Sequence, residues 1–242
     1  MKTCIITGYG INADRELADA FRLAGSEAER VHLNDLIDDP AMVSKYRIIG
    51  FPGGFSFGDH LGSGLVFAGL FKRHLSQELA AFIADGGLII GICNGFQVLV
   101  KMGVLPNYNK DSQPCVSLIH NESGRFDNRW VRIHADPESH CIWTKGISEL
   151  DVPIRHGEGR FITANEEVYQ RLAADRLIAF TYEGRNPNGS QGNIAGITDP
   201  TGRILGLMPH PEAYLYPRNH PAWAEGDGIT IFRNGVAAAE SS

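Results

Sequence analysis

The chain has 242 residues, 43% of them hydrophobic and 21% charged, with a formal net charge of −6 at pH 7. Its length and composition fit one globular α/β domain over residues 1–242, and no apolar run approaches the roughly 18 residues that cross a bilayer. Because the charge is acidic and no Lys/Arg cluster is present, nucleic-acid binding is not expected, and the lack of a signal-peptide pattern predicts a cytoplasmic protein without a membrane partner.

Short β-rich runs alternate with helical patterns in the first half of the chain. Strands are predicted at residues 3–7, 30–33, 47–50 and 88–92, and helices at 14–24 and within 63–84. This alternation is typical of a parallel sheet with helices on both faces. Ligands bind such sheets beyond the carboxyl ends of the strands, where glycine-rich turns let the backbone approach them. Three turns of this kind lie at residues 8–12, 52–58 and 91–95.

The second half begins with a segment of different character. Between residues 107 and 160 the helical periodicity fades, and short apolar runs at 116–119 and 130–133 stand among Pro, Asn and Asp. We interpret this segment as a β-rich insertion within the same domain. Further strands are predicted at residues 177–182, 194–198 and 204–207, and a last helix near 228–239.

Cys93 stands in the most informative motif of the chain. The run Leu88-Ile-Ile-Gly-Ile-Cys93-Asn-Gly-Phe-Gln97 has an apolar strand, a G-x-C-x-G turn and a helix start, the cysteine counterpart of the G-x-S-x-G nucleophile elbow. The two glycines leave room for a sharp turn that is expected to push the Cys93 side chain into solvent. Backbone N–H groups at a helix start favour a thiolate, and that of Asn94 is placed to stabilise an oxyanion. The motif predicts a nucleophile, the alternative being a buried cysteine in a tight turn.

The other three cysteines lack this setting. Cys4 lies in a predicted core strand, Cys115 in an apolar run and Cys141 beside a tryptophan, so packing roles are expected for all three. No C-x-x-C spacing is present, which predicts free thiols and no metal site.

A histidine and a carboxylate follow a late predicted strand in Gly206-Leu-Met-Pro-His210-Pro-Glu212. Because a residue before proline disfavours the α region, this segment is expected to be extended, with His210 and Glu212 pointing the same way. A carboxylate that orients an imidazole is the third member of a nucleophile, base and orienter arrangement. His210 is therefore the predicted base and Glu212 its partner. His156, in Arg155-His-Gly-Glu-Gly159, is either a substrate contact or part of a structural turn.

Nucleotide and metal motifs are weak in this sequence. Gly8-Tyr-Gly10-Ile-Asn-Ala13 partly matches the dinucleotide fingerprint, but no acidic residue closes the second strand, so a plain β–α turn is favoured. Neither a phosphate-binding loop nor a cluster of metal ligands is visible. No cofactor and no metal are expected in this chain.

With cysteine, histidine and glutamate in this order, the sequence resembles the class I glutamine amidotransferases. Among them it is similar to the family of glutaminase subunits of phosphoribosylformylglycinamidine synthase, an enzyme of de novo purine synthesis. The segments that carry this narrower resemblance are Pro52-Gly-Gly-Phe-Ser-Phe-Gly-Asp59, Gly91-Ile-Cys-Asn-Gly-Phe-Gln97, Asn121-Glu-Ser-Gly-Arg-Phe126, Arg129-Trp-Val131, His156-Gly-Glu-Gly-Arg160, Asn186-Pro-Asn-Gly-Ser190, Asn193-Ile-Ala-Gly-Ile197 and Leu207-Met-Pro-His-Pro-Glu212. The chain departs from the family pattern at Ala213 and after Asp59, where arginines are usual.

The resemblance implies a flavodoxin-like α/β/α fold with a mostly parallel sheet and a reaction in which Cys93 attacks the glutamine amide, forms a glutamyl thioester and releases ammonia. Ammonia would pass to a large synthetase subunit that amidates formylglycinamide ribonucleotide, usually with a small third subunit, and ATP and magnesium would belong to that partner. By position, Gly53, Gly54 and Asn94 would form the oxyanion hole. The residues expected to bind glutamine are Gln97, Asn121, Ser123, Phe126, His156 and Gly157.

Three other functions are weighed against this one. A cysteine hydrolase or peptidase of the same superfamily typically has histidine directly after the cysteine, where this chain has Asn94. A non-catalytic glutamine sensor would have no need of the complete triad. A glutaminase that serves a different synthetase is less consistent with the segments at residues 156–160 and 186–190.

Overall fold

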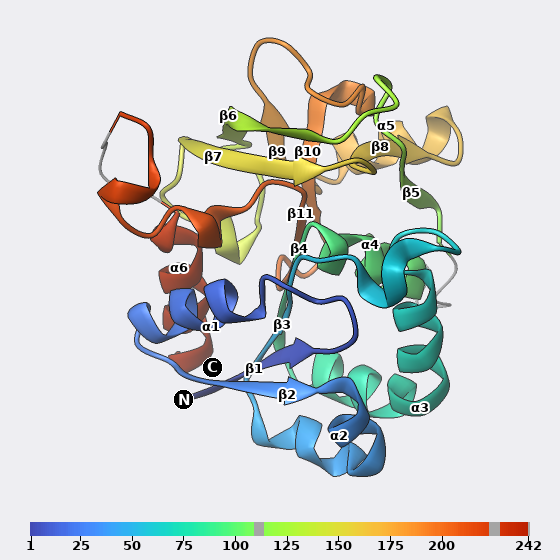
Figure 1. Ribbon diagram of the computed structural model, residues 1–242, viewed down its shortest axis with the longest axis vertical. Helices are drawn as coiled ribbons and strands as arrows, with labels where there is room; N and C mark the ends of the chain where they lie inside the picture. Colours follow the sequence, from blue (N-terminus) through green and yellow to red (C-terminus); the bar gives the residue numbers. More distant parts are fainter. Residues whose placement is uncertain (109–113, 223–227, 242) are drawn as a thin grey trace.

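Nine strands form one mixed sheet in the computed structural model, which describes residues 1–108, 114–222 and 228–241 (Figure 1). The parallel strands are β1 (Lys2–Thr7), β2 (Glu27–His32), β3 (Ile48–Phe51), β4 (Leu88–Ile92) and β11 (Ile204–Leu207). The antiparallel strands are β6 (Asp127–Ala135), β7 (Glu149–His156), β9 (Ile178–Tyr182) and β10 (Ile194–Thr198). Their order is β2-β1-β3-β4-β11-β10-β9-β6-β7.

The inner strands are central because they are apolar on both sides. Every residue of β3, β4, β10 and β11 is buried, as expected for strands that are covered on both faces. In the edge strand β2, by contrast, only Ala28 and Val31 are buried. A separate antiparallel pair, β5 (Val116–Ile119) with β8 (Arg160–Thr163), lies outside the main sheet.

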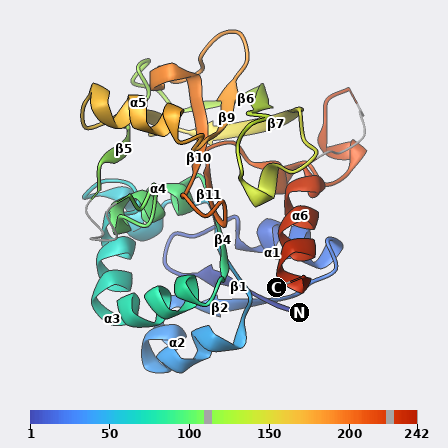
Figure 2. The same ribbon diagram turned by 180° about the vertical axis from the view of Figure 1, so that it is seen from behind.

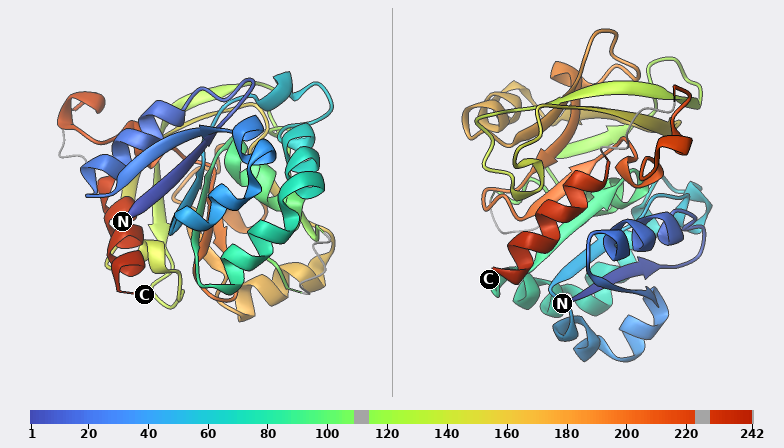
Figure 3. Two further views of the ribbon diagram at one scale, coloured as in Figure 1. Left: turned by 90° about the horizontal axis from the view of Figure 1, so that it is seen from below. Right: turned by 90° about the vertical axis from the view of Figure 1, so that its left-hand side faces the viewer.

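Helices cover both faces of the parallel half (Figures 1, 2 and 3). The α-helices are α1 (Asp14–Leu23), α2 (Leu33–Asp38), α3 (Leu65–Ala84), α4 (Asn94–Met102), α5 (Glu166–Ala174) and α6 (Ile229–Glu240). On one face α1 packs on α6, with the rings of Phe21 and Phe232 5.2 Å apart. On the other face α3 packs on α4, and α3 buries apolar side chains at helical spacing, including Phe67, Phe71 and Leu75.

Short 3-10 helices connect several of these elements. They are η1 (Pro40–Lys45), η2 (Ser56–Asp59), η3 (Ile142–Thr144), η4 (Gln191–Asn193), η5 (Pro211–Ala213) and η6 (Pro217–Asn219). Within the described ranges, no helix is both long enough and apolar enough to cross a bilayer.

Most of the predicted strands and helices are confirmed, with small shifts at their ends. The strands at 88–92, 116–119, 194–198 and 204–207 have the predicted bounds. The strand predicted at 30–33 begins earlier and ends at His32, because Leu33 starts α2 and His32 Nδ1 accepts a hydrogen bond from the N–H of Asn34. The short helix α2 and helix α5 were not predicted.

The β-rich insertion differs more from its prediction. The run at 130–133 is the middle of the nine-residue strand β6, and β7 was not predicted as a strand. Both strands extend the main sheet through pairs such as Trp130 with Pro153, so the insertion continues the sheet instead of only decorating it. The α/β fold is therefore a parallel half joined to an antiparallel half, and both halves contribute to the site described next.

Candidate active site

Cys93 lies in a strained turn between β4 and α4. Its backbone has φ 52° and ψ −106°, a region that a side chain with a Cβ rarely adopts. The turn is tight, because a Cβ added at Gly95 would collide with the carbonyl oxygen of Phe51. The G-x-C-x-G pattern therefore reflects close packing of the elbow on β3, and the strain aims the thiol away from the sheet.

The thiol is not in solvent, which corrects the expectation from the sequence. Cys93 is only 5% exposed and lines a cavity of about 190 Å³ beyond the carboxyl ends of the parallel strands. Its Sγ lies 3.8 Å from the carbonyl oxygen of Arg155. The lining residues are Asn12, Gly54, Phe55, Asp59, Ser63, Cys93, Gln97, Phe126, Arg155, His156, Gly157, Glu158 and His210.

The structure places the side chains of His210 and Glu212 together, but through a backbone conformation that differs from the predicted one. Pro211–Ala213 forms the 3-10 helix η5, so the segment is not extended through Glu212. The turn still places His210 Nδ1 2.6 Å from Glu212 Oε1, and the N–H of His210 donates to the carbonyl of Pro153 at 2.8 Å. The proline after His210 thus starts a turn, and the side chains meet across it.

Charge around His210 favours its protonated form. Burial alone would lower the pKa of His210, but the negative charges of Glu212 and Cys93, together with the hydrogen bond to Glu212, outweigh burial and raise the pKa to about 9. The Glu212 side chain is completely buried. An imidazolium at His210 is therefore the charge state that this geometry favours.

The predicted oxyanion-hole residues lie beside the thiol. A Cβ at Gly53 would be 2.8 Å from His210 Cε1 and 3.5 Å from Cys93 Cβ, so a side chain here would fill the space between them. Gly54, with φ 152°, lines the cavity. Asn94 begins α4, and its side chain accepts from the N–H of Ser56 and donates to Gln97 Oε1 at 3.0 Å. The oxyanion role of these backbone amides stays a prediction.

Four of the six residues expected to bind glutamine line the cavity: Gln97, Phe126, His156 and Gly157. Gln97 Nε2 donates to the carbonyl of Glu158 at 2.5 Å, which ties α4 to the loop after β7. Burial, with a smaller contribution from His210, lowers the pKa of His156 to about 4. His156 is therefore a neutral member of the lining.

Asn121 and Ser123 are not among the residues that line the cavity, and their contact with glutamine stays a prediction. Asn121 is buried and supports the loop: its Nδ2 donates to the carbonyls of Arg125 and His156, and its Oδ1 accepts from the N–H of Gly159. The Ser123 hydroxyl is exposed and contacts Arg125 locally. Asn121 thus shapes the wall of the cavity from behind.

Several lining residues were not predicted individually. Asp59 ends one motif segment, and burial raises the pKa of its carboxyl group. Glu158 approaches it from the loop after β7, through the N–H of Ser63 at 3.5 Å. Their signal was membership in segments 52–59 and 156–160, which carry the family resemblance, but nothing local indicated that the two carboxylates would share one cavity. Arg155 had no signal beyond standing before His156.

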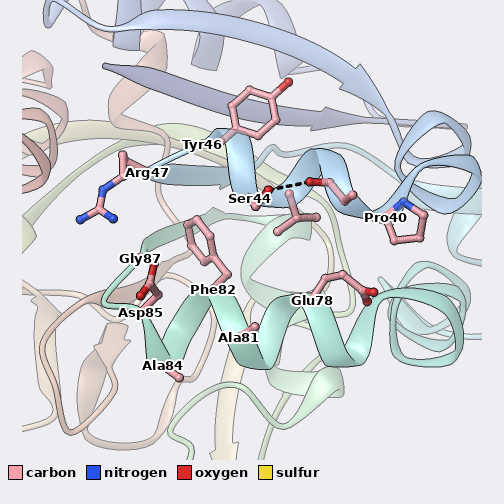
Figure 4. Close-up of a pocket in the computed structure, with 12 residues that line it drawn as sticks. Pro40, Ser44, Tyr46, Arg47, Glu78, Ala81, Phe82, Ala84, Asp85 and Gly87 are labelled. Atoms are coloured by element: carbon pink, nitrogen blue, oxygen red, sulfur yellow. Dashed lines mark hydrogen bonds between the residues drawn. The ribbon is translucent and has the colours of Figure 1, made fainter.

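A larger cavity of about 550 Å³ lies between η1 and the C-terminal part of α3 (Figure 4). Its wall includes Tyr46, Phe82 and the backbone around Ser44, whose hydroxyl donates to the carbonyl of Ala41 at 2.8 Å. No cysteine or histidine is among its lining residues, so it holds no counterpart of the Cys93 and His210 pair. The candidate active site is therefore identified by the residues that line its cavity, and not by the volume of the cavity.

One cluster of possible metal ligands lies on the antiparallel half. Ligand atoms of His134, Glu149 and Glu183 are within 4.8 Å of one another. Arg132 lies 3.8 Å from each of the two glutamates and pairs with Asp151 at 2.8 Å, so positive charge is already supplied there. None of these residues lines the cavity of Cys93.

Known proteins match this chain over nearly its whole length. The family model described as a CobB/CobQ-like glutamine amidotransferase domain matches residues 1–237. The phosphoribosylformylglycinamidine synthase subunit PurQ of Dehalococcoides mccartyi is 44% identical, covering 98% of this chain and 96% of that protein. The subunit PurQ of Methanococcus maripaludis is 45% identical, covering 92% and 85%.

A solved structure supports the same relationship. A chain in the structure of PurLQS from Thermotoga maritima superposes with a TM-score of 0.76 and 30% identity, covering 98% of both chains. The fold, the elbow cysteine and the matches along the sequence agree. The chain belongs to the CobB/CobQ-like glutamine amidotransferase family, as a relative of the PurQ subunits of phosphoribosylformylglycinamidine synthase.

Proposed function

We propose that this chain, acting as one domain over residues 1–242, is the glutaminase subunit of a phosphoribosylformylglycinamidine synthase. It hydrolyses L-glutamine to glutamate and ammonia for an ATP-dependent synthetase subunit that converts formylglycinamide ribonucleotide to formylglycinamidine ribonucleotide. The observation that carries the proposal is the strained Cys93 elbow, facing a small cavity with the His210–Glu212 pair at 2.6 Å.

The geometry supports a two-step hydrolysis. The Cys93 thiolate attacks the side-chain carbonyl carbon of glutamine, and backbone amides near Gly54 and Asn94 stabilise the oxyanion. Protonated His210 gives its proton to the departing nitrogen, so that ammonia leaves and a glutamyl thioester forms. Neutral His210 then takes a proton from water, which attacks the thioester and releases glutamate and the thiolate. Glu212 holds His210 in the required tautomer throughout.

An apolar rim around the cavity supports docking to a partner. Two large apolar side chains at the cavity are about half exposed, Phe55 at 46% and Phe126 at 54%. Phe55 and Phe126 line the cavity itself, with ring centroids 6.3 Å apart. Exposed apolar surface gathered around a site is typical of an interface. A synthetase seated there would receive ammonia directly and shield it from water.

The remaining partners follow from the same proposal. ATP and magnesium act in the synthetase, which a small third subunit accompanies, and this chain uses no cofactor of its own. The names of its relatives support a multi-subunit enzyme, because they are described as subunits and one belongs to PurLQS. The complex works in the cytoplasm, where purine synthesis has its substrates.

Labelling of Cys93 by the glutamine mimic diazo-oxo-norleucine, read by peptide mass spectrometry with and without the synthetase, tests the function. We expect labelling at Cys93 that glutamine protects, and faster labelling with the synthetase, since docking completes the site. Cys115 is a half-exposed cysteine in the same chain and serves as the internal control. Labelling by iodoacetamide without any response to the mimic would contradict a glutaminase and favour another cysteine hydrolase.

A further inference from the structure

Arg155, at the end of β7, contacts all three members of the triad. Its Nη2 lies 3.2 Å from His210 Nδ1 and 3.9 Å from Glu212 Oε1, and its carbonyl oxygen lies 3.8 Å from Cys93 Sγ. The same Nη2 donates to Glu16 Oε2 of α1 at 2.8 Å. One guanidinium therefore connects α1 to the histidine–carboxylate pair, and the mechanism above gives it no role.

The contact between Arg155 and His210 is not a hydrogen bond. His210 Nδ1 donates its proton to Glu212, so it has no lone pair with which to accept from the guanidinium. The approach is therefore between two donors, which is favourable only because a carboxylate lies next to both. Glu212 is that carboxylate.

Glu212 needs more positive charge than His210 supplies. Its side chain is completely buried, and its Oε2 has no hydrogen-bond partner in the described part of the chain. A buried carboxylate with one bare oxygen is energetically costly unless cations or hydrogen-bond donors stand nearby. The guanidinium at 3.9 Å supplies the missing charge.

Glu16 holds the positively charged guanidinium of Arg155 in place. Its carboxylate accepts from Arg155 at 2.8 Å and holds the guanidinium, which would otherwise be free to turn away from the donor–donor contact with His210. Charges of alternating sign then follow one another from Glu16 through Arg155, Glu212 and His210 to Cys93. Each group is held by the opposite charge of its neighbours.

We propose that Arg155, braced by Glu16, is a positioning residue that holds the Glu212 carboxylate beside His210 and keeps His210 oriented toward Cys93. The inference rests on the proposed glutaminase function, and it concerns how the triad is held, not which bonds are made. Arg155 acts through Glu212 and His210, and Glu16 acts through Arg155.

The proposal predicts in which direction the titration of His210 and Cys93 shifts when each neighbouring charge is removed. The groups that face His210 are Cys93 of the elbow, Glu212 of its own turn, Arg155 and neutral His156 of β7 and, through Arg155, Glu16 of α1. Removing the positive charge of Arg155 raises the pH at which His210 loses its proton and at which the thiolate forms. Removing the negative charge of Glu16 leaves the positive charge of Arg155 less neutralised, so both of these pH values should fall.

The test compares Arg155→Gln, Arg155→Lys and Glu16→Gln with wild type and with Arg132→Gln. The last variant makes the same charge change on β6, outside the cavity. For each full-length chain, the iodoacetamide labelling rate of Cys93 is followed against pH by mass spectrometry. In the complex with synthetase, kcat and KM for glutamine are measured over the same pH range.

We expect Arg155→Gln to move the pH of half-maximal labelling upward by roughly 0.5–1 unit and Glu16→Gln to move it downward by less. Arg155→Gln should lower kcat by roughly 10-fold to 100-fold with little change in KM, and Arg155→Lys should recover part of the loss. Arg132→Gln should match wild type in both measurements. If Arg155→Gln behaves like Arg132→Gln, or if Glu16→Gln shifts the profile in the same direction as Arg155→Gln, the inference is wrong. A wild type that the glutamine mimic does not label would instead refute the proposed function.

Discussion

The two halves of the sheet contribute to the site in different ways. The parallel half supplies the reacting groups: Cys93 follows β4 and His210 follows β11, both at the carboxyl ends of neighbouring strands. The antiparallel half supplies the wall, through Arg155 and His156 at the end of β7 and the loop behind them that Asn121 supports. A parallel sheet brings consecutive strand ends to one edge by its topology. An antiparallel hairpin reaches that edge only through long-range pairing, so its contribution is supporting.

Because the two halves have different roles, loss of the nucleophile should abolish the reaction without disturbing the cavity wall that the antiparallel half supplies. Cys93→Ala should lower glutaminase activity by at least about 10³-fold, because neither step can occur without the thiolate. Its free energy of unfolding should change by less than about 1.5 kcal/mol, since the truncated atom faces a cavity. An assay of glutamate release checks the expected activity, and urea unfolding checks the expected stability. Residual turnover above a few per cent would place the chemistry elsewhere.

The next largest loss of activity is expected from adding a methyl group at Gly53, beside Cys93 and His210. Gly53→Ala would put a methyl group 2.8 Å from His210 Cε1 and force the imidazole away from the thiol. We expect kcat to fall by roughly 10²-fold, because a misplaced catalytic group costs about this much. Gly146→Ala is a control for the loss of a glycine, since a Cβ there meets nothing within 4 Å, although its φ of 73° adds strain. Full activity of Gly53→Ala would contradict the placement of His210.

A change in the antiparallel half should weaken binding more than chemistry. Asn121→Ala leaves the N–H of Gly159 and the carbonyls of His156 and Arg125 without their partner, at a cost of about 1–3 kcal/mol in unfolding free energy. The loop should loosen, and KM for glutamine should rise roughly 10-fold, the equivalent of about 1.4 kcal/mol, with a smaller change in kcat. Ser123→Ala, close by but exposed, should match wild type. Equal effects of the two variants would mean that Asn121 does not support the site.

The smallest expected effect concerns pH and stability. The pKa of His210 is raised from 6.5 to about 9 in the folded chain, so its proton binds more tightly there than in the unfolded chain. This contribution is complete below pH 6.5 and is lost as the pH rises through 9. Wild type should therefore lose more stability than His210→Gln between these two pH values in urea unfolding. Parallel pH profiles for the two proteins would show that His210 is not held as an imidazolium.

The difference between the halves also explains how far the sequence was informative. Cys93 could be predicted because the strand, the turn and the helix start that define an elbow are consecutive in the chain. The approach of His210 and Glu212 was predicted, but not its 3-10 turn, because a proline specifies its own φ and not the conformation that follows.

The wall of the cavity was less predictable. β7 carries Glu149, Asp151 and Arg155 among its apolar residues and includes a proline, so its pattern does not indicate a strand until β6 pairs with it. Phe126 and Asn121 belong to one motif, yet the first lines the cavity and the second lies behind it. Which face a loop residue presents depends on pairing between distant segments, and no local pattern contains that information.

The most direct test of the account is to trap the intermediate on Cys93. The complete synthetase complex would be mixed with isotopically labelled glutamine, quenched in acid during turnover, and analysed by peptide mass spectrometry beside Cys93→Ala. The account predicts a labelled glutamyl group on the Cys93 peptide of the wild type and none in the variant, which should form no ammonia. Steady glutamate production by the wild type with a label on another residue, or with turnover retained in Cys93→Ala, would contradict the claim that this elbow cysteine is the nucleophile.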